Sequence, residues 1–233
     1  MAQSSVNPLV YSAGLENGVA YLITFVVQLM MAKRTFYIIF FSLLVLGFFG
    51  TLAAVVPGFV HPKTAAIGMV QPFAFTNQDG QTVTEKDFQG KVTVVNFFFT
   101  SCRSVCPRMN NNLRPAYEAF RNEPDFVLLS YTCDPERDSA SRLKHYADSM
   151  GVDTKKWIFL TGRKDSLYSM ARHSYKIDDP KNYVQNINDD FLHTQFVALV
   201  NRKGEVVNIY DGLKPSELDQ MQLEIKKLLK EKL

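Results

Sequence analysis

The sequence predicts an α/β domain with a partly parallel sheet, preceded by one transmembrane helix. Two observations favour this fold class. An uncharged apolar run of 25 residues, Phe36–Val60, lies near the N-terminus. Beyond it, short β-branched and aromatic runs alternate with amphipathic stretches, which is typical of a central mixed sheet covered by helices on both faces. Only a short polar turn ending in Gly204 separates the last two apolar runs, which predicts a closing antiparallel hairpin.

The composition is that of a folded protein and argues against a nucleic-acid partner. Of the 233 residues, 46% are hydrophobic and 21% are charged, so wholesale disorder is excluded. The net charge is only +3, and the basic residues are interspersed with acidic ones, which indicates a solvated surface. Three cysteines are too few for a disulfide framework, and two of them lie close together, which points to redox or metal chemistry.

The apolar run predicts a membrane anchor over residues 35–60. About 20 apolar residues are enough to cross the hydrocarbon core as a helix. Lys33 and Arg34 directly precede the run, so the positive-inside rule keeps residues 1–34 in the cytoplasm and places everything after the anchor on the other side. A cleaved signal peptide is the alternative, but the run is long for one and no clear small-x-small site precedes His61.

Residues 1–30 carry no lysine or arginine, so they do not resemble a mitochondrial transit peptide. This favours a single-pass protein of the cell inner membrane, with its C-terminal part in the periplasm. The apolar piece Val19–Met31 is too short to span a bilayer by itself. Because Met30 and Met31 directly precede Ala-Lys-Arg and the anchor, we expect the native chain to begin at one of them.

The exported part divides into a linker at residues 61–72 and a folded domain at residues 73–233. The linker is predicted from its two prolines and its lack of periodicity. We expect Pro115 to kink or interrupt the first helix of the domain. The expected strands are Lys91–Thr100, Phe126–Thr132, Lys156–Gly162, Thr194–Asn201 and Glu205–Tyr210, after a hairpin that turns at Asp79-Gly80; the expected helices are Pro107–Arg121, Ser139–Met150, Lys164–Tyr175 and Pro215 to the C-terminus.

Cys102 and Cys106 lie between a buried strand and the following helix, at the sheet edge where ligand chemistry collects in open α/β folds. Positions four apart share a helix face, with Cβ atoms about 5–6 Å apart. Both sulfurs could therefore bind one ion or join as a disulfide. The helix N-terminus and Arg103 both favour the thiolate form. The pair is expected to be functional, but spacing alone does not separate metal binding from dithiol chemistry.

His193 is the histidine best placed to join the cysteines, because it ends a polar loop and directly precedes a buried strand. On spacing alone, a loop histidine that caps or hydrogen-bonds locally remains the simpler interpretation. His61, His145 and His173 are adequately explained by exposed positions.

Four ordered motifs between Phe73 and Leu229 resemble the SCO/SenC copper proteins of cytochrome c oxidase assembly. They are Thr-x-Cys-x-x-x-Cys-Pro from Thr100, Asp-Pro-x-Arg-Asp from Asp134 to Asp138, Trp-Ile-Phe-Leu-Thr-Gly from Trp157, and Asp-Phe-Leu-His-Thr from Asp190. The N-terminal anchor agrees with the layout of that family. The resemblance implies that residues 73–233 form a thioredoxin-like domain in which Cys102, Cys106 and His193 hold one copper ion.

The implied function is a membrane-anchored copper metallochaperone that supplies the binuclear copper centre in subunit II of cytochrome c oxidase. Two thiolates suit Cu(I), and an imidazole lets the same site tolerate Cu(II). The alternative is a thiol-disulfide oxidoreductase that uses the Cys102/Cys106 dithiol to reduce exported client cysteines. The two functions differ in their dependence on His193. A peroxiredoxin is disfavoured, because no Pro-x-x-x-Thr-x-x-Cys sequence leads into the cysteine pair.

Two positions depart from the family pattern. Arg103 stands where many members have proline after the first cysteine. Cys133 is not a usual family feature, and it is either a packed strand residue or an extra thiol near the site. Asp134, the next residue, either supports the site from behind or caps the following turn. We expect neither Cys133 nor Asp134 to be a ligand.

Overall fold

The computed structural model describes residues 22, 25, 33–52, 55, 66–178, 191–192 and 194–231. The chain divides into two compact units, Met1–Lys63 and Thr64–Leu233. In the first unit, Lys33–Leu52 is the one described helix that is long and apolar enough to cross a membrane, a test that a signal sequence also meets. The start sites expected at Met30 and Met31 lie outside the described residues.

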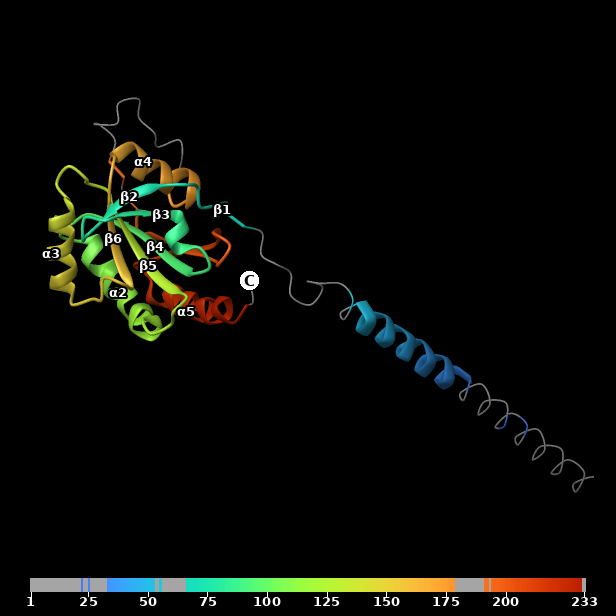
Figure 1. Cartoon of the computed structure of the whole chain (residues 1–233). Helices are drawn as coiled ribbons and strands as arrows, with labels where there is room; N and C mark the ends of the chain where they lie inside the picture. The colour runs from blue at the N-terminus through green and yellow to red at the C-terminus, as the bar shows by residue number, and fades with distance from the viewer. Residues whose placement is uncertain are drawn as a thin grey trace, which may run out of the picture. The chain divides into compact units, whose positions relative to one another are not determined.

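An eight-stranded mixed sheet forms the centre of the second unit (Figure 1). Its strands lie in the order β1-β8-β7-β4-β5-β6-β2-β3. The pairs β4·β5 and β5·β6 are parallel, and every other neighbouring pair is antiparallel. The bounds are β1 Gly68–Met69, β2 Ala74–Asn77, β3 Thr82–Thr84, β4 Val92–Phe98, β5 Phe126–Thr132, β6 Trp157–Thr161, β7 Phe196–Val200 and β8 Glu205–Asp211.

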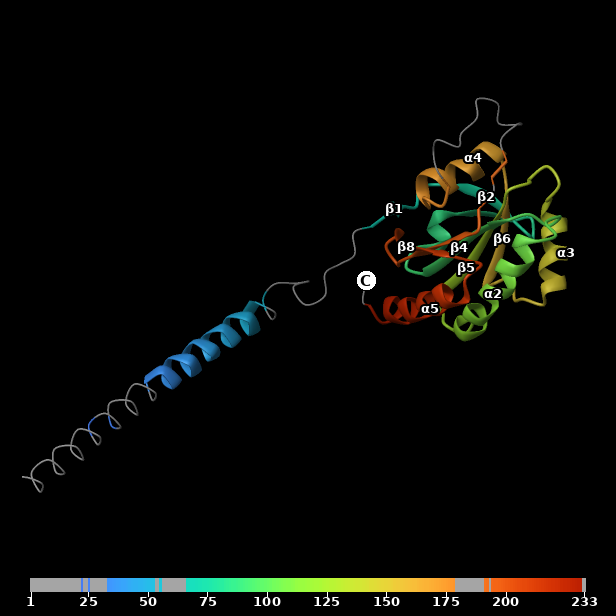
Figure 2. The same cartoon turned by 180° about the vertical axis from the view of Figure 1, so that it is seen from behind.

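Helices cover both faces of this sheet, as Figures 1 and 2 show from opposite sides. The bounds are α2 Val105–Phe120, α3 Ala140–Met150, α4 Lys164–Ser169 and α5 Pro215–Lys230; a 3-10 turn covers Glu85–Phe88, and a π-helix, Met170–Ser174, continues α4. Side chains of α2, α3 and α5 share one apolar cluster with Val94 of β4. Side chains of α4 share the other with Val95. The central strand is therefore buried on both faces, and the predicted α/β class is confirmed.

Strand β7 is antiparallel to β4, with Asn96 of β4 opposite Val197 of β7. The chain that leaves β4 toward the cysteines therefore meets the chain that enters β7. Because β5 is parallel to β4, with Phe98 opposite Thr132, β5 ends at the same edge. This edge of the sheet collects the segments in which the candidate site residues lie.

The expected interruption at Pro115 is wrong, because α2 continues through it to Phe120. A proline inside a helix leaves the carbonyl four residues earlier without its usual N–H donor. Here that carbonyl belongs to Asn111, and both Asn111 and Pro115 are exposed. Water can therefore replace the lost donor, and the buried face of the helix is unaffected.

Near the C-terminal end of the linker expected at residues 61–72, Gly68 and Met69 pair with β8 as β1. Glycine is required at the first position, since a Cβ there would lie 2.4 Å from the carbonyl oxygen of Ser174. Such a close approach between two backbones depends on the tertiary structure. The local pattern of hydrophobicity therefore does not predict this strand.

Candidate functional site

Cys102 and Cys106 come together where β4 passes into α2. The backbone N–H of Cys106 donates a hydrogen bond to Sγ of Cys102 at 3.4 Å. The backbone N–H of Cys102 donates in turn to the carbonyl of Phe99 at 3.2 Å. Since α2 begins at Val105, two residues earlier than predicted, Cys106 lies in its first turn and Cys102 just before it. The two sulfurs thus lie at the N-terminus of a helix, where negative charge is stabilised.

The pKa values of the two thiols are shifted in opposite directions. Burial raises the pKa of Cys102, but hydrogen bonds from the Cys106 thiol and from the backbone of Cys106, Ser104 and Val105 outweigh it and hold the pKa below its ordinary value. For Cys106, burial and the hydrogen bond to the Cys102 sulfur raise the pKa to about 12. Cys102 is half-buried and Cys106 is buried. Cys102 is therefore the accessible thiol that loses its proton more readily, and Cys106 is its protonated partner.

A pocket of about 260 Å³ opens beside the pair. Its walls come from the end of β4, the start of α2, the end of β5 and the segment before β7. The lining residues are Phe97, Phe98, Phe99, Cys102, Ser104, Val105, Cys106, Cys133, Leu192, Thr194 and Gln195. Both sequence neighbours of His193 therefore line the same pocket as the cysteines. His193 itself lies outside the described residues.

The chain on either side of His193 is attached to the domain. Leu192 is 1% exposed and packs in the cluster on the α4 face. The Thr194 hydroxyl donates to the carbonyl of Ile177 at 2.9 Å. Within the described part of the chain, no group of three or more His, Cys, Asp or Glu side chains could hold a metal ion.

Cys133 lines this pocket too, which answers part of the question that the sequence left open. It packs in the cluster on the α4 face, whereas Cys106 packs in the cluster on the α2 face. Its side chain is 2% exposed, and burial raises its thiol pKa well above the ordinary value. Cys133 is thus both a packed strand-end residue and a neighbour of the site, held in its neutral form.

The family-model comparison decides the identity. The model described as SCO1/SenC matches residues 62–230. The chain belongs to the SCO1/SenC family. Among curated proteins, the SCO1 protein homolog of Bacillus subtilis (strain 168) is 30% identical over 161 residues, which cover 67% of this chain and 81% of the relative.

Solved structures of SCO proteins share the thioredoxin-like fold of this SCO1/SenC chain. BsSco, described as a member of the Sco family of cytochrome c oxidase assembly proteins with a disulfide switch, has a TM-score of 0.61 at 27% identity, covering 72% of this chain and 98% of that one. Arabidopsis thaliana ScoI with copper bound has a TM-score of 0.54 at 30% identity, covering 70% and 99%. The predicted fold and family are confirmed.

The remaining motif residues of this SCO1/SenC protein have distinct positions. His145 and His173 are exposed, as predicted, and so is Arg103; His61 lies outside the described residues. Asp134 closes a turn, since its carbonyl accepts from the N–H groups of Arg137 at 3.1 Å and Asp138 at 2.9 Å. Of the two alternatives for Asp134, the turn is the one that these contacts support.

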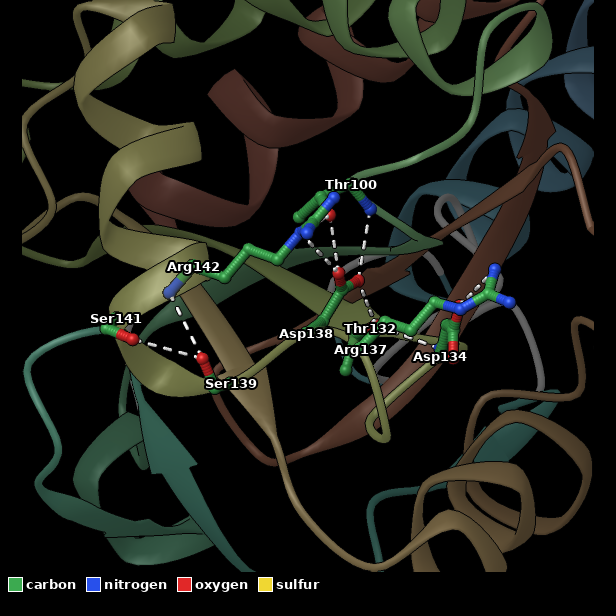
Figure 3. Close-up of polar contacts among 8 residues, drawn as sticks. All are labelled: Thr100, Thr132, Asp134, Arg137, Asp138, Ser139, Ser141 and Arg142. Carbon is green, nitrogen blue, oxygen red and sulfur yellow. Dashed lines mark hydrogen bonds and ion pairs between the residues drawn. The ribbon is translucent and has the colours of Figure 1, made fainter.

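Asp138 is the residue whose importance the sequence did not predict. It is a carboxylate with 0% exposure, bonded to both Thr100 and Thr132 (Figure 3). The only signal in the sequence is its place at the end of the Asp-Pro-x-Arg-Asp motif, six residues after the end of a buried strand.

Proposed function

We propose that this SCO1/SenC protein is a membrane-anchored copper metallochaperone. In this proposal, Cys102, Cys106 and His193 hold one copper ion as cargo for the binuclear copper centre of cytochrome c oxidase. One observation carries the proposal: the two cysteines share a pocket with both sequence neighbours of His193. The copper-bound ScoI of Arabidopsis and the oxidase-assembly role of BsSco support it.

The donor set fits copper. Two thiolates are the soft ligands that Cu(I) prefers, and a neutral imidazole also suits Cu(II). The lowered pKa of Cys102 makes its thiol the easier of the two to deprotonate for binding. Cys106 must lose its proton on binding, because its pKa is raised to about 12 in the metal-free chain. Three protein ligands leave a position open through which a client can take the ion.

The site belongs outside the cytoplasm in this proposal. Lys33–Leu52 serves as the single-pass anchor in the inner membrane, and the domain from residue 73 onward lies in the periplasm. The basic residues Lys33 and Arg34 at the start of this helix support that orientation. The client is subunit II of cytochrome c oxidase or a similar exported copper acceptor.

A thiol-disulfide oxidoreductase is the second candidate, favoured by the unequal acidities of the two thiols. The Cys102 thiolate would attack a client disulfide, forming a mixed disulfide and releasing one client thiolate. Cys106 would then lose its proton and attack the sulfur of Cys102, which closes the Cys102–Cys106 disulfide and releases the second client thiol. Two electrons pass from the dithiol to the client, and the reaction makes no use of His193.

Copper binding to the full chain in detergent tests the proposal. We expect the unaltered protein to bind copper at one ion per chain, and Cys102→Ser, Cys106→Ser and His193→Ala each to lose stable binding. His145→Ala is the matched control, because it removes an exposed histidine on α3. Unchanged stoichiometric affinity in His193→Ala would defeat the ligand assignment. Full reduction of a client disulfide by a chain that binds no copper would favour the oxidoreductase.

A further inference from the structure

Asp138 joins three elements around the start of the cysteine loop (Figure 3). Its Oδ2 accepts from the backbone N–H of Thr100 at 3.0 Å and from the Thr132 hydroxyl at 2.6 Å, and its Oδ1 accepts from the Thr100 hydroxyl at 2.5 Å. Arg142 of α3 lies 3.6 Å from Oδ1. The carboxylate thus links the end of β5, the segment after β4 and the first turns of α3.

Thr100 is held through both its hydroxyl and its backbone N–H. Its hydroxyl donates to Asp138 and accepts from Nε of Arg142 at 2.7 Å, while its N–H is taken by Asp138. Thr132 is used as fully, since its hydroxyl also accepts from the N–H of Asp134 at 2.9 Å. Neither hydroxyl is left to rotate, so the network has a single arrangement.

Thr100 lies in the sequence between Phe99 and Cys102, which are joined by a backbone hydrogen bond. Phe99, on one side of Thr100, accepts the N–H of Cys102 on its carbonyl at 3.2 Å. Cys102 lies two residues beyond Thr100 on the other side. A rotation of the peptide groups around Thr100 would therefore move Cys102 and disturb the hydrogen bond that its sulfur accepts from the N–H of Cys106.

Burying a carboxylate is unfavourable unless hydrogen bonds and a counter-charge compensate. Joining two strand ends does not require such a group, because apolar packing could serve. The position of the Asp138 carboxylate against Thr100 is explained if Asp138 controls the geometry of the cysteine loop. We propose that Asp138 is a positioning residue that fixes the Cys102–Cys106 loop in its ligand geometry through Thr100. Arg142 supports the same arrangement from the solvent side, because it contacts both Asp138 and Thr100.

This inference rests on the proposed function for its copper readout but has a second, metal-free readout. The variants are Asp138→Asn and Thr100→Val, with Thr100→Ser as the conservative form that keeps the hydroxyl. Asp148→Asn, an exposed carboxylate also on α3, is the control. Asparagine offers one acceptor oxygen and places an NH₂ group against a donor, so at least one of the three hydrogen bonds is lost. Valine removes the hydroxyl at nearly constant shape.

Two quantities are measured on the full chain: copper affinity by competition with a chelator, and the Cys102–Cys106 disulfide equilibrium against glutathione. We expect Asp138→Asn and Thr100→Val to weaken copper binding about tenfold or more, as loss of a group supporting metal ligands typically does. Both should also shift the disulfide equilibrium by severalfold. Thr100→Ser should restore both quantities, and Asp148→Asn should change neither.

A purely structural role would lower the thermal midpoint and leave both quantities unchanged in the folded variants, which would overturn the inference. If Asp138→Asn fails to fold, Thr100→Val against Thr100→Ser decides the question alone. If the unaltered chain binds no copper, the proposed function fails, and the disulfide equilibrium still tests the positioning role.

Discussion

The backbone N–H of Cys106 points at Sγ of Cys102 across 3.4 Å, while the Cys106 thiol itself is buried. One residue thus stabilises the thiolate of the other and keeps its own proton. This relationship gives the two cysteines different chemistry, although they are only four residues apart.

The first prediction concerns selective modification. In the reduced, copper-free chain at neutral pH, iodoacetamide should alkylate Cys102 at least tenfold faster than Cys106 or Cys133, because only Cys102 combines exposure with a lowered pKa. Peptide mapping by mass spectrometry at several times measures the three rates. Equal rates for Cys102 and Cys106 would contradict the assignment of their roles.

The second prediction is that copper loading releases protons. Cys106 has a pKa of about 12 without metal, so it is protonated at neutral pH and must give up its proton to bind. The copper affinity should therefore fall about tenfold or more for each pH unit below neutrality. Chelator competition at several pH values measures this slope. An affinity independent of pH between about 6 and 8 would be inconsistent with Cys106 as a ligand.

A third prediction follows from the buried thiol at the end of β5. The pKa of Cys133 is raised in the folded chain, so above about pH 9 the unfolded state loses a proton that the folded state keeps. The stability that this group contributes is complete below pH 9 and is lost as the pH rises, by up to about 1.4 kcal/mol per pH unit. Cys133→Ala should flatten the decline in free energy of unfolding between about pH 9 and 10. Equal slopes for both proteins in denaturant titrations would refute this.

The fourth prediction concerns the buried, hydrogen-bonded side chains of Ser130, Asn96 and Asn110, which link two strands to α2. Asn96, with 0% exposure, accepts from the Ser130 hydroxyl at 2.6 Å and donates to Asn110 at 3.1 Å. Asn96→Ala leaves both partners without this bond and should lower the free energy of unfolding by about 2–4 kcal/mol. Urea unfolding measures the loss. In the double variant with Asn110→Ala, the combined loss should fall short of the sum, and strict additivity would show that the two amides are not coupled.

Much of the fold was predictable because its central strands are uniformly buried. The run Phe126–Thr132 matches β5 at both ends, and the hairpin turn at Asp79-Gly80 is confirmed, with Gly80 at φ +79°. The continuation of α2 past Pro115 was not predictable, since it depends on which face of the helix meets solvent. The strand β1 depends on a partner more than a hundred residues away.

The candidate site was predictable in its cysteines and only partly in its surroundings. Spacing placed Cys102 and Cys106 together, because both belong to one local turn. The burial of Asp138 could not be predicted from the sequence, since its partners Thr100, Thr132 and Arg142 belong to different elements. The role of His193 as a ligand remains a prediction that rests on the family resemblance and on its neighbours in the pocket.

The antiparallel pairing of β4 with β7 brings two segments that are far apart in the sequence to one edge of the sheet. The cysteines follow the end of β4, and Leu192 and Thr194 precede the start of β7. The pairing of Asn96 with Val197 joins the two strands at this edge. Because the ring of Phe99, just after β4, packs edge-on against Phe191 with centroids 5.3 Å apart, a change in length or composition of one segment also alters the surroundings of the other.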